Sequence, residues 1–251
     1  MSGKITQILK SLESFYKRPN VFISGSVECF DDNNQNDDDK HKLFVHNLTK
    51  KILSNKCKII TGKGKTIGDI TIDATLDYMF SNGYQRLDEY IKMRPFPLEF
   101  TREGKTENEK EAIKEDRNRK YRDEMLKEAG VAIFIYGNKQ DKNTKSIEES
   151  NGMEEEFNLA VEKGIKPIPI GATGYITKKL WDKVTNNFDE YYPSIDGNKK
   201  TMEEIKSLMQ EIGDEQKFKE QIKNNPDNKY FEKIYNNIIE IVKKLNTVDS
   251  L

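Results

Sequence analysis

The stretch that decides the fold reads VAIFIYGNKQDKNTKSIEESNGMEEEFNLAVEKGIKPIPIGATGY and covers residues 131–175. It begins with a continuous apolar run, which is typical of a strand buried on both faces, and continues into a polar loop. A helical segment then opens at Gly152, and KPIPIG (166–171) reads as a second strand. This order predicts one unit of a parallel sheet, and a strand that ends in glycine before a helix usually holds an anion.

The same alternation of strands and helices extends over most of the chain. Further strands are predicted at 21–26, at 57–69 together with the glycine turn that ends it, and within 87–100, and further helices at 41–55, 69–83, 101–130 and 177–193. We therefore predict an α/β fold, a Rossmann-like doubly wound parallel sheet with helices on both faces. In such sheets ligands bind beyond the carboxyl ends of the strands.

The two ends of the chain have a different character from the predicted sheet domain, which we place at residues 20–195. Residues 4–17 carry apolar side chains at helical spacing, so residues 1–19 are expected to be an N-terminal linker helix. Residues 196–251 read as two or three polar helices. They predict a C-terminal helical extension that packs on the sheet domain or on a partner chain.

Composition excludes several classes of function. Charged residues make up 34% of the 251 residues and nearly cancel, to a net charge of −1, which argues against nonspecific binding of nucleic acid or of a membrane surface. No apolar run is long enough for a transmembrane helix, and the N-terminus does not resemble a signal peptide, so a cytoplasmic location is expected. Cys29 and Cys57 are expected to be reduced thiols, and no cluster has metal-ligand spacing, so no metal site is predicted.

Four predicted strands end in glycine-bearing turns, at residues 24–26, 61–64, 137–139 and 171–174. Glycine lets backbone N–H groups approach a phosphate closely. The turn GKGKTIGD matches neither a Walker A loop nor the dinucleotide fingerprint. Four such turns at one edge of a parallel sheet nevertheless indicate a nucleotide-like ligand.

Charged side chains near these turns supply candidates for ligand contacts. The basic candidates are Lys63, Arg94, Arg119, Arg122 and Lys139. Arginine would hold a phosphate through two hydrogen bonds, and lysine would act as a point charge. For Arg119 and Arg122, spacing alone favours a solvated helix face beside Asp116 and Glu124. The acidic run 154–156 opens a helix, where its charge complements the helix dipole or accepts hydrogen bonds from ribose hydroxyls.

Six segments follow one another along the chain: FISGS, IITGKGKTIGD, RNRKYRDEM, AIFIYGNK, SNGMEEEF and PIPIGATGY. In this order they resemble the SLOG superfamily, the relatives of the Lonely Guy phosphoribohydrolases. A closer resemblance is to the SLOG sensor domain of the sirtuin-like effectors of Thoeris antiphage defence, over about residues 20–195. It implies a sensor that binds a cyclic ADP-ribose isomer made by a partner TIR-domain protein. Binding would reorganise a homo-oligomer and switch on an NAD-hydrolysing domain.

The resemblance also assigns ligand contacts. It places Arg122, Lys139 and Glu154 against the ligand, the last two from opposite sides of one pocket. Gly25 and Ser26 match the first phosphate-binding turn of the family, and Gly62 and Gly64 match its second glycine turn. The full set of predicted ligand-binding residues is Gly25, Ser26, Gly62, Lys63, Gly64, Arg94, Arg122, Lys139, Gly152 and Glu154. No catalytic residue is predicted, and no cofactor besides the nucleotide ligand is expected.

This sequence departs from the catalytic members of the superfamily, which carry a PGGxGTxxE signature. Here Gly137-Asn138-Lys139 ends the strand, a long loop follows, Met153 replaces the threonine, and Glu156 stands at the acidic end. We therefore expect binding without cleavage, and no enzymatic activity of this chain by itself. A sirtuin-like domain is not recognisable in it, so it is expected to be an excised sensor domain, covalently linked to such a domain in the whole protein, or a stand-alone sensor.

Two alternatives stay open. One is a Lonely Guy-like nucleotide phosphoribohydrolase, in which Arg119 or Arg122 would hold the phosphate and Glu156 would assist cleavage of the glycosidic bond. The other is an oligomerisation scaffold built on the helices at 4–17 and 201–246, which are expected to form an interface in any of these cases.

Overall fold

The computed structural model describes residues 5, 9, 12, 20–30, 38–83, 86–95, 106–141, 143–193, 198–224 and 229–248, without the side chains of 107, 108, 110 and 111. Five parallel strands form one sheet in the order β3-β2-β1-β4-β7. They are β1 (Asn20–Ser26), β2 (Lys58–Thr61), β3 (Ile91–Met93), β4 (Val131–Tyr136) and β7 (Lys166–Pro169). This topology confirms the predicted Rossmann-like α/β sheet.

The two central strands carry the core of the sheet. Every residue of β4 is buried, as its continuous apolar run predicts for a strand covered on both faces. β1 pairs with β2 on one side and with β4 on the other, so that Gly25 lies opposite Ile135. The strand order reverses between β1 and β4, and a doubly wound sheet opens its ligand crevice at such a point.

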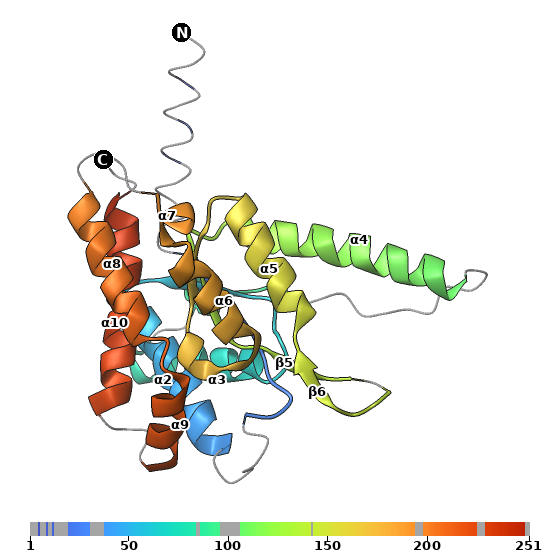
Figure 1. The fold of residues 1–251 in the computed structure, drawn as a ribbon, viewed down its shortest axis with the longest axis horizontal. Helices are drawn as coiled ribbons and strands as arrows, with labels where there is room; N and C mark the ends of the chain where they lie inside the picture. Colours follow the sequence, from blue (N-terminus) through green and yellow to red (C-terminus); the bar gives the residue numbers. More distant parts are fainter. Residues whose placement is uncertain are drawn as a thin grey trace.

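Helices cover both faces of the sheet. α2 (Asp38–Ser54) packs against α3 (Ile67–Ser81), and α4 (Glu107–Leu126) packs against α5 (Asn151–Glu162). Right-handed crossovers place these two pairs on opposite faces. After β7 come α6 (Tyr175–Asn186) and α7 (Phe188–Tyr191), and short 3-10 turns stand at Leu87–Glu89 and Gly171–Thr173. The N-terminal part of α4, which opens with a capping box between Thr106 and Glu109, extends away from the body of the molecule (Figure 1).

The C-terminal helices α8 (Lys199–Glu211), α9 (Glu215–Asn224) and α10 (Lys229–Val248) pack on the sheet domain through α2 and α6 (Figure 1). Aromatic rings fill this contact: Phe44 of α2 lies 4.9 Å from Phe218 and 5.7 Å from Phe231, measured between ring centroids. The extension therefore shares its core with the sheet. The boundaries at residues 20 and 196 stay predictions.

The structure differs from the sequence expectation between β4 and α5. The predicted polar loop contains a short antiparallel hairpin, β5 (Asn138–Gln140) with β6 (Ile147–Glu149). Its turn is closed by the Asp141 carboxylate, which accepts hydrogen bonds from the backbone N–H groups of Asn143 and Thr144. Such local side-chain bonding is typical of turns, and the polar composition alone does not show it.

Two other predicted segments lie mostly outside the described residues. Of the N-terminal helix, only Ile5, Leu9 and Leu12 are described; they are helical and half exposed or more. The other is the acidic run DDNNQNDDD at 31–39, whose composition predicts a solvated loop; only its last two residues are described, and they begin α2.

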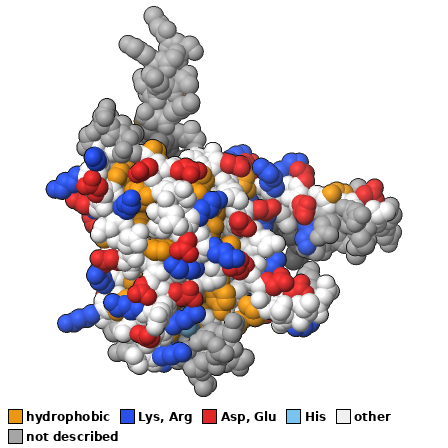
Figure 2. Space-filling view, viewed as in Figure 1, with side chains coloured by type: hydrophobic (Ala, Val, Ile, Leu, Met, Phe, Trp, Pro, Cys, Tyr) orange, Lys and Arg blue, Asp and Glu red, His pale blue; other side chains and the backbone are white. Residues whose placement is uncertain are grey.

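The surface carries both signs of charge. On the face shown in Figure 2, lysines and arginines are interspersed with aspartates and glutamates, without a large patch of one sign. In the described part of the chain, no helix is long and apolar enough to cross a membrane.

Candidate ligand-binding site

A cavity of about 150 Å³ lies at the carboxyl end of β1, between the β2–α3 loop, α4 and the start of α5. Six of the ten predicted ligand residues line it, namely Gly25, Ser26, Gly62, Gly64, Arg122 and Gly152. The prediction did not include the other lining residues, which are Phe22, Ile23, Ser24, Ser150, Met153 and Glu156. The glycine turns of two neighbouring strands and the arginine of a distant helix therefore meet at one place.

The walls of this cavity need glycine because backbone approaches backbone there. A Cβ atom on Gly64 would lie 2.1 Å from the carbonyl oxygen of Gly25, and one on Gly25 would lie 2.8 Å from Ile67. The β2–α3 loop is thus pressed against the end of β1. This close approach brings main-chain groups of both turns to the cavity, where side chains would otherwise keep them apart.

Arg122 reaches the cavity from the C-terminal part of α4. Its side chain is 12% exposed, and its Nη1 forms an ion pair with Glu155. Its Nε lies 3.6 Å from Oε1 of Glu156. A Cβ atom on Gly152 would be 2.7 Å from Nη2, so glycine at the start of α5 leaves room for the guanidinium. An arginine that lines a cavity and is fixed by neighbouring carboxylates in this way can present hydrogen-bond donors to an anion.

Glu156 is the carboxylate that the structure places inside the cavity. Its Oε2 accepts a 2.6 Å hydrogen bond from the Ser24 hydroxyl, and the residue is 8% exposed. The sequence carried a signal for this position. Met153, Glu156, Phe157 and Ala160 are buried at the spacing i, i+3, i+4 and i+7, so Glu156 stands on the apolar face of α5.

Burial raises the pKa of the Glu156 carboxyl above its ordinary value of 4.5, and the Ser24 hydrogen bond and the Arg122 charge offset this only in part. The folded protein therefore holds this proton at a pH where the unfolded chain has lost it. The stability that Glu156 contributes is present below pH 4.5 and falls as the pH rises toward the raised pKa.

We expect Glu156→Gln to gain stability relative to the wild type as the pH rises from about 4 to 7, because glutamine needs no ionisation and still accepts from Ser24. Urea unfolding at several pH values measures the difference between the two free energies of unfolding. Glu162→Gln, at the exposed end of the same helix, is the control for removing one carboxylate. A difference that shrinks as the pH rises would contradict the assignment.

α5 begins at the cavity, because Ser150, Gly152 and Met153 line it. Its N-cap residue, Ser150, does not cap the first turn with its side chain. α3 contributes no residue to the lining, and its first two N–H groups, those of Ile67 and Gly68, donate to the carbonyls of Lys65 and Gly64. The start of α5 and its dipole thus favour an anion at the cavity.

Strained backbone clusters at the same edge of the sheet. Lys63, Thr66, Tyr136 and Tyr175 have positive φ angles of 54° to 64°. For a β-branched residue such as Thr66 this conformation is a genuine outlier. At Tyr136 the surroundings hold it in place: the N–H donates to the Thr173 hydroxyl at 2.8 Å, and the carbonyl accepts from Thr177 at 2.6 Å. Strain that neighbouring groups hold in this way is common at binding sites.

The remaining four predicted residues do not line the cavity. Lys63 lies between two lining glycines, but its ammonium is 3.6 Å from Asp69. Arg94 follows β3, and its guanidinium lies 3.7 Å from Glu128.

Lys139 lies on the hairpin and Glu154 on the first turn of α5, and neither is part of the cavity lining. Lys139 follows Asn138, whose carbonyl accepts a hydrogen bond from Ser26, and it pairs in register with Glu148 of the hairpin. Glu154 is exposed on the first turn of α5. A role for either residue in ligand binding stays a prediction.

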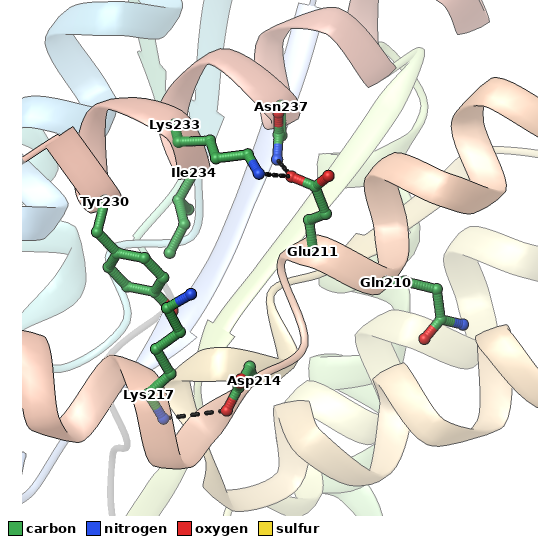
Figure 3. A pocket seen from close by; sticks show the side chains of 8 residues that line it. All are labelled: Gln210, Glu211, Asp214, Lys217, Tyr230, Lys233, Ile234 and Asn237. Carbon is green, nitrogen blue, oxygen red and sulfur yellow. Dashed lines mark hydrogen bonds and ion pairs between the residues drawn. The ribbon is translucent and has the colours of Figure 1, made fainter.

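A second cavity, of about 160 Å³, lies in the helical extension and contains none of the predicted residues. Figure 3 shows Lys233 and Asn237 of α10 pointing at Glu211 of α8. Their nitrogen atoms lie 2.7 Å and 2.8 Å from its Oε2. The Lys233 and Glu211 charges neutralise one another, and both contacts tie α8 to α10, so we assign this cavity a structural role.

A shallow groove of about 620 Å³ between α6 and α9 is lined by three lysines and three carboxylates, beside a glycine and a glutamine. Among the described residues, no group of His, Cys, Asp and Glu side chains could hold a metal ion. The cavity at the end of β1 is thus the one where two glycine turns, the start of α5 and a buried charge converge.

Comparison with known proteins identifies relatives over nearly the whole chain. The model of the Sir2- and TIR-associating SLOG family matches residues 4–245. The chain is 34% identical over 200 residues to the NAD(+) hydrolase ThsA of Bacillus cereus (strain MSX-D12), 35% over 192 residues to that of Cytobacillus dafuensis, and 31% over 212 residues to that of Acinetobacter baumannii (strain 532279). These matches cover 80%, 75% and 83% of this chain but only 38%, 36% and 41% of the relatives.

Proposed function

The chain belongs to the Sir2- and TIR-associating SLOG family, and on this premise we propose that it is a nucleotide sensor. It binds a cyclic ADP-ribose isomer that a TIR-domain protein makes, and binding activates an NAD-hydrolysing effector in antiphage defence. The observation that carries the proposal is the cavity in which the glycine turns of β1 and β2 meet Arg122. Its relatives are named NAD(+) hydrolases, and the chain spans about two fifths of their length.

The chemistry of the cavity suits a phosphate. The start of α5, the close-packed glycine turns and the Arg122 guanidinium all favour negative charge. Glu156 and Ser24 at its inner end suit a hydroxyl group, as a ribose provides. A phosphorylated ribose thus finds partners of both kinds within one small space.

The size of the cavity limits what enters it. Pockets that enclose a drug-sized ligand measure about 300–1,000 Å³, and this one measures about 150 Å³. In our proposal a phosphate and its ribose occupy the cavity, and the rest of the nucleotide extends over the rim toward Lys139 and Glu154. This arrangement would give Lys139 and Glu154 the ligand contacts that the family resemblance implies.

Isothermal titration calorimetry of the purified chain with cyclic ADP-ribose and its linkage isomers tests the proposal. We expect at least one isomer to bind, and adenosine, which has no phosphate, to bind far more weakly. At a protein concentration of about 100 μM, binding with a Kd of about 10 μM would give a clear heat signal. Absence of heat with every isomer at this concentration would refute the sensor function.

One observation favours a second candidate, cleavage of a nucleotide's glycosidic bond. Glu156 is a buried carboxyl of raised pKa beside Arg122, which suits a general acid or base. The residues Gly137-Asn138-Lys139, in place of the PGG turn of the catalytic relatives, weigh against it. Chromatography of the ligand and of AMP after incubation with the chain separates the two functions, because only a hydrolase releases free base.

A further inference from the structure

The Arg122 guanidinium faces two neighbouring carboxylates that differ in their surroundings. Glu156 is enclosed, hydrogen-bonded to Ser24 and part of the apolar face of α5. The Glu155 side chain is 53% exposed and forms an ion pair with Nη1 of Arg122, whose own side chain is 12% exposed. One carboxylate is thus built into the cavity wall, while the other reaches the same arginine from solvent.

The position of Glu155 is that of an anion competing for the arginine. A phosphate that enters the cavity needs hydrogen-bond donors of the guanidinium, and Glu155 already holds one of them. Glu156 cannot leave without breaking its bond to Ser24 and uncovering the core. Glu155 can swing into water at little cost, because a half-exposed ion pair contributes little.

We propose that Glu155 is an internal competitor that sets the affinity and the phosphate specificity of the site. An anionic ligand displaces the Glu155 carboxylate from Arg122, whereas Glu156 stays in place. A phosphate with two negative charges, or a pyrophosphate, binds Arg122 more strongly than the single Glu155 carboxylate does. An uncharged nucleoside cannot displace this carboxylate. The inference rests on the proposed nucleotide-binding function of this cavity.

The α4–α5 contact offers a matched control. Arg119 lies 3.9 Å from Glu162, near the other end of α5, and both side chains are more than 60% exposed. Glu162→Gln therefore removes one negative charge from the same helix and breaks a pair with the same partner helix. It does so away from the lining of the cavity.

Calorimetry with cyclic ADP-ribose isomers and with linear ADP-ribose, on the wild type, Glu155→Gln and Glu162→Gln, tests the inference. We expect Glu155→Gln to bind the phosphate-bearing probes about two- to five-fold more tightly, the range that a partly exposed ion pair implies. Glu162→Gln should remain within about 1.5-fold of the wild type.

The outcomes separate this inference from the function on which it rests. If the wild type binds and Glu155→Gln binds equally or more weakly, the competitor role is wrong and the sensor function stands. Weaker binding would mean that Glu155 positions Arg122 for the ligand. If no variant binds any phosphate-bearing probe, the proposed function fails, and the inference fails with it.

Discussion

Replacement of Arg122 by alanine is expected to weaken nucleotide binding about a hundred-fold. The guanidinium is the one lining side chain of this cavity with a permanent positive charge. Its loss removes two charge-assisted hydrogen bonds to a phosphate, of about 1.5–3 kcal/mol each. Part of this free energy is offset, because the guanidinium already bonds Glu155 before the ligand enters. It also leaves Glu155 and Glu156 facing the ligand without a counter-charge. Calorimetry with the isomer that binds the wild type measures the change in Kd.

Arg119→Ala is the matched control for this loss. Arg119 lies one turn earlier on α4, carries the same charge and is 68% exposed beside Glu162. We expect its Kd to remain within about two-fold of the wild type, because a surface charge contributes little. Urea unfolding shows whether each variant is folded. If Arg122→Ala does not fold, Arg122→Lys is the variant to test. It keeps the positive charge but cannot form two parallel hydrogen bonds to a phosphate, so it should bind the ligand about ten-fold more weakly than the wild type. Binding by folded Arg122→Ala within three-fold of the wild type would contradict the site.

Replacement of Gly64 by alanine is expected to cost about 3 kcal/mol or more of the free energy of unfolding. The new Cβ would lie 2.1 Å from the Gly25 carbonyl oxygen, and 3.2 Å from its carbon. Both are backbone atoms of β1 at the centre of the sheet, so no flexible side chain can move aside. Overpacking usually costs about 1–3 kcal/mol even where side chains can move, so a clash with the backbone should cost at least as much. Urea or thermal unfolding measures the loss.

Gly164→Ala serves as the comparison, because it separates a backbone clash from backbone strain. Gly164 ends α5 with a φ of +73°, and a Cβ there would meet no atom within 4 Å. The left-handed conformation alone should cost about 1 kcal/mol. If Gly64→Ala loses no more stability than Gly164→Ala, the close approach of the two turns at the cavity is wrong.

Much of the fold could be predicted because its signals are local. The apolar runs at 21–26 and 131–136 identify strands buried on both faces, and the alternation with helical segments identifies a parallel sheet. Gly25, Gly62 and Gly64 could be predicted as site residues for the same reason. Gly25 lies at the end of β1, Gly62 and Gly64 lie in the turn after β2, and the carboxyl ends of parallel strands meet at one edge.

Other features could not be read from neighbouring residues. The hairpin at 138–149 depends on the turn that Asp141 closes, and polar composition does not distinguish it from a loop. The packing of α8, α9 and α10 on the sheet domain depends on aromatic contacts such as that of Phe44 with Phe218, which are 174 positions apart in the chain. Of the predicted charges, Arg94 pairs with Glu128 and Lys63 with Asp69, contacts that spacing alone does not reveal.

The sequence by itself determined the order of the strands along the chain, the helices between them and the glycine turns at their ends, because a few adjacent residues encode each of these. The spacing of apolar residues on α5 indicates that Glu156 lies on the apolar face of the helix, but only the tertiary structure decided which members of the run Glu154-Glu155-Glu156 meet the cavity and Arg122. Successive residues of a helix point about 100° apart, so the answer depends on how α5 is rotated against β1. Burial of Met153 and Phe157 sets that rotation, turning Glu156 inward to Ser24 and leaving Glu155 at the edge to hold Arg122.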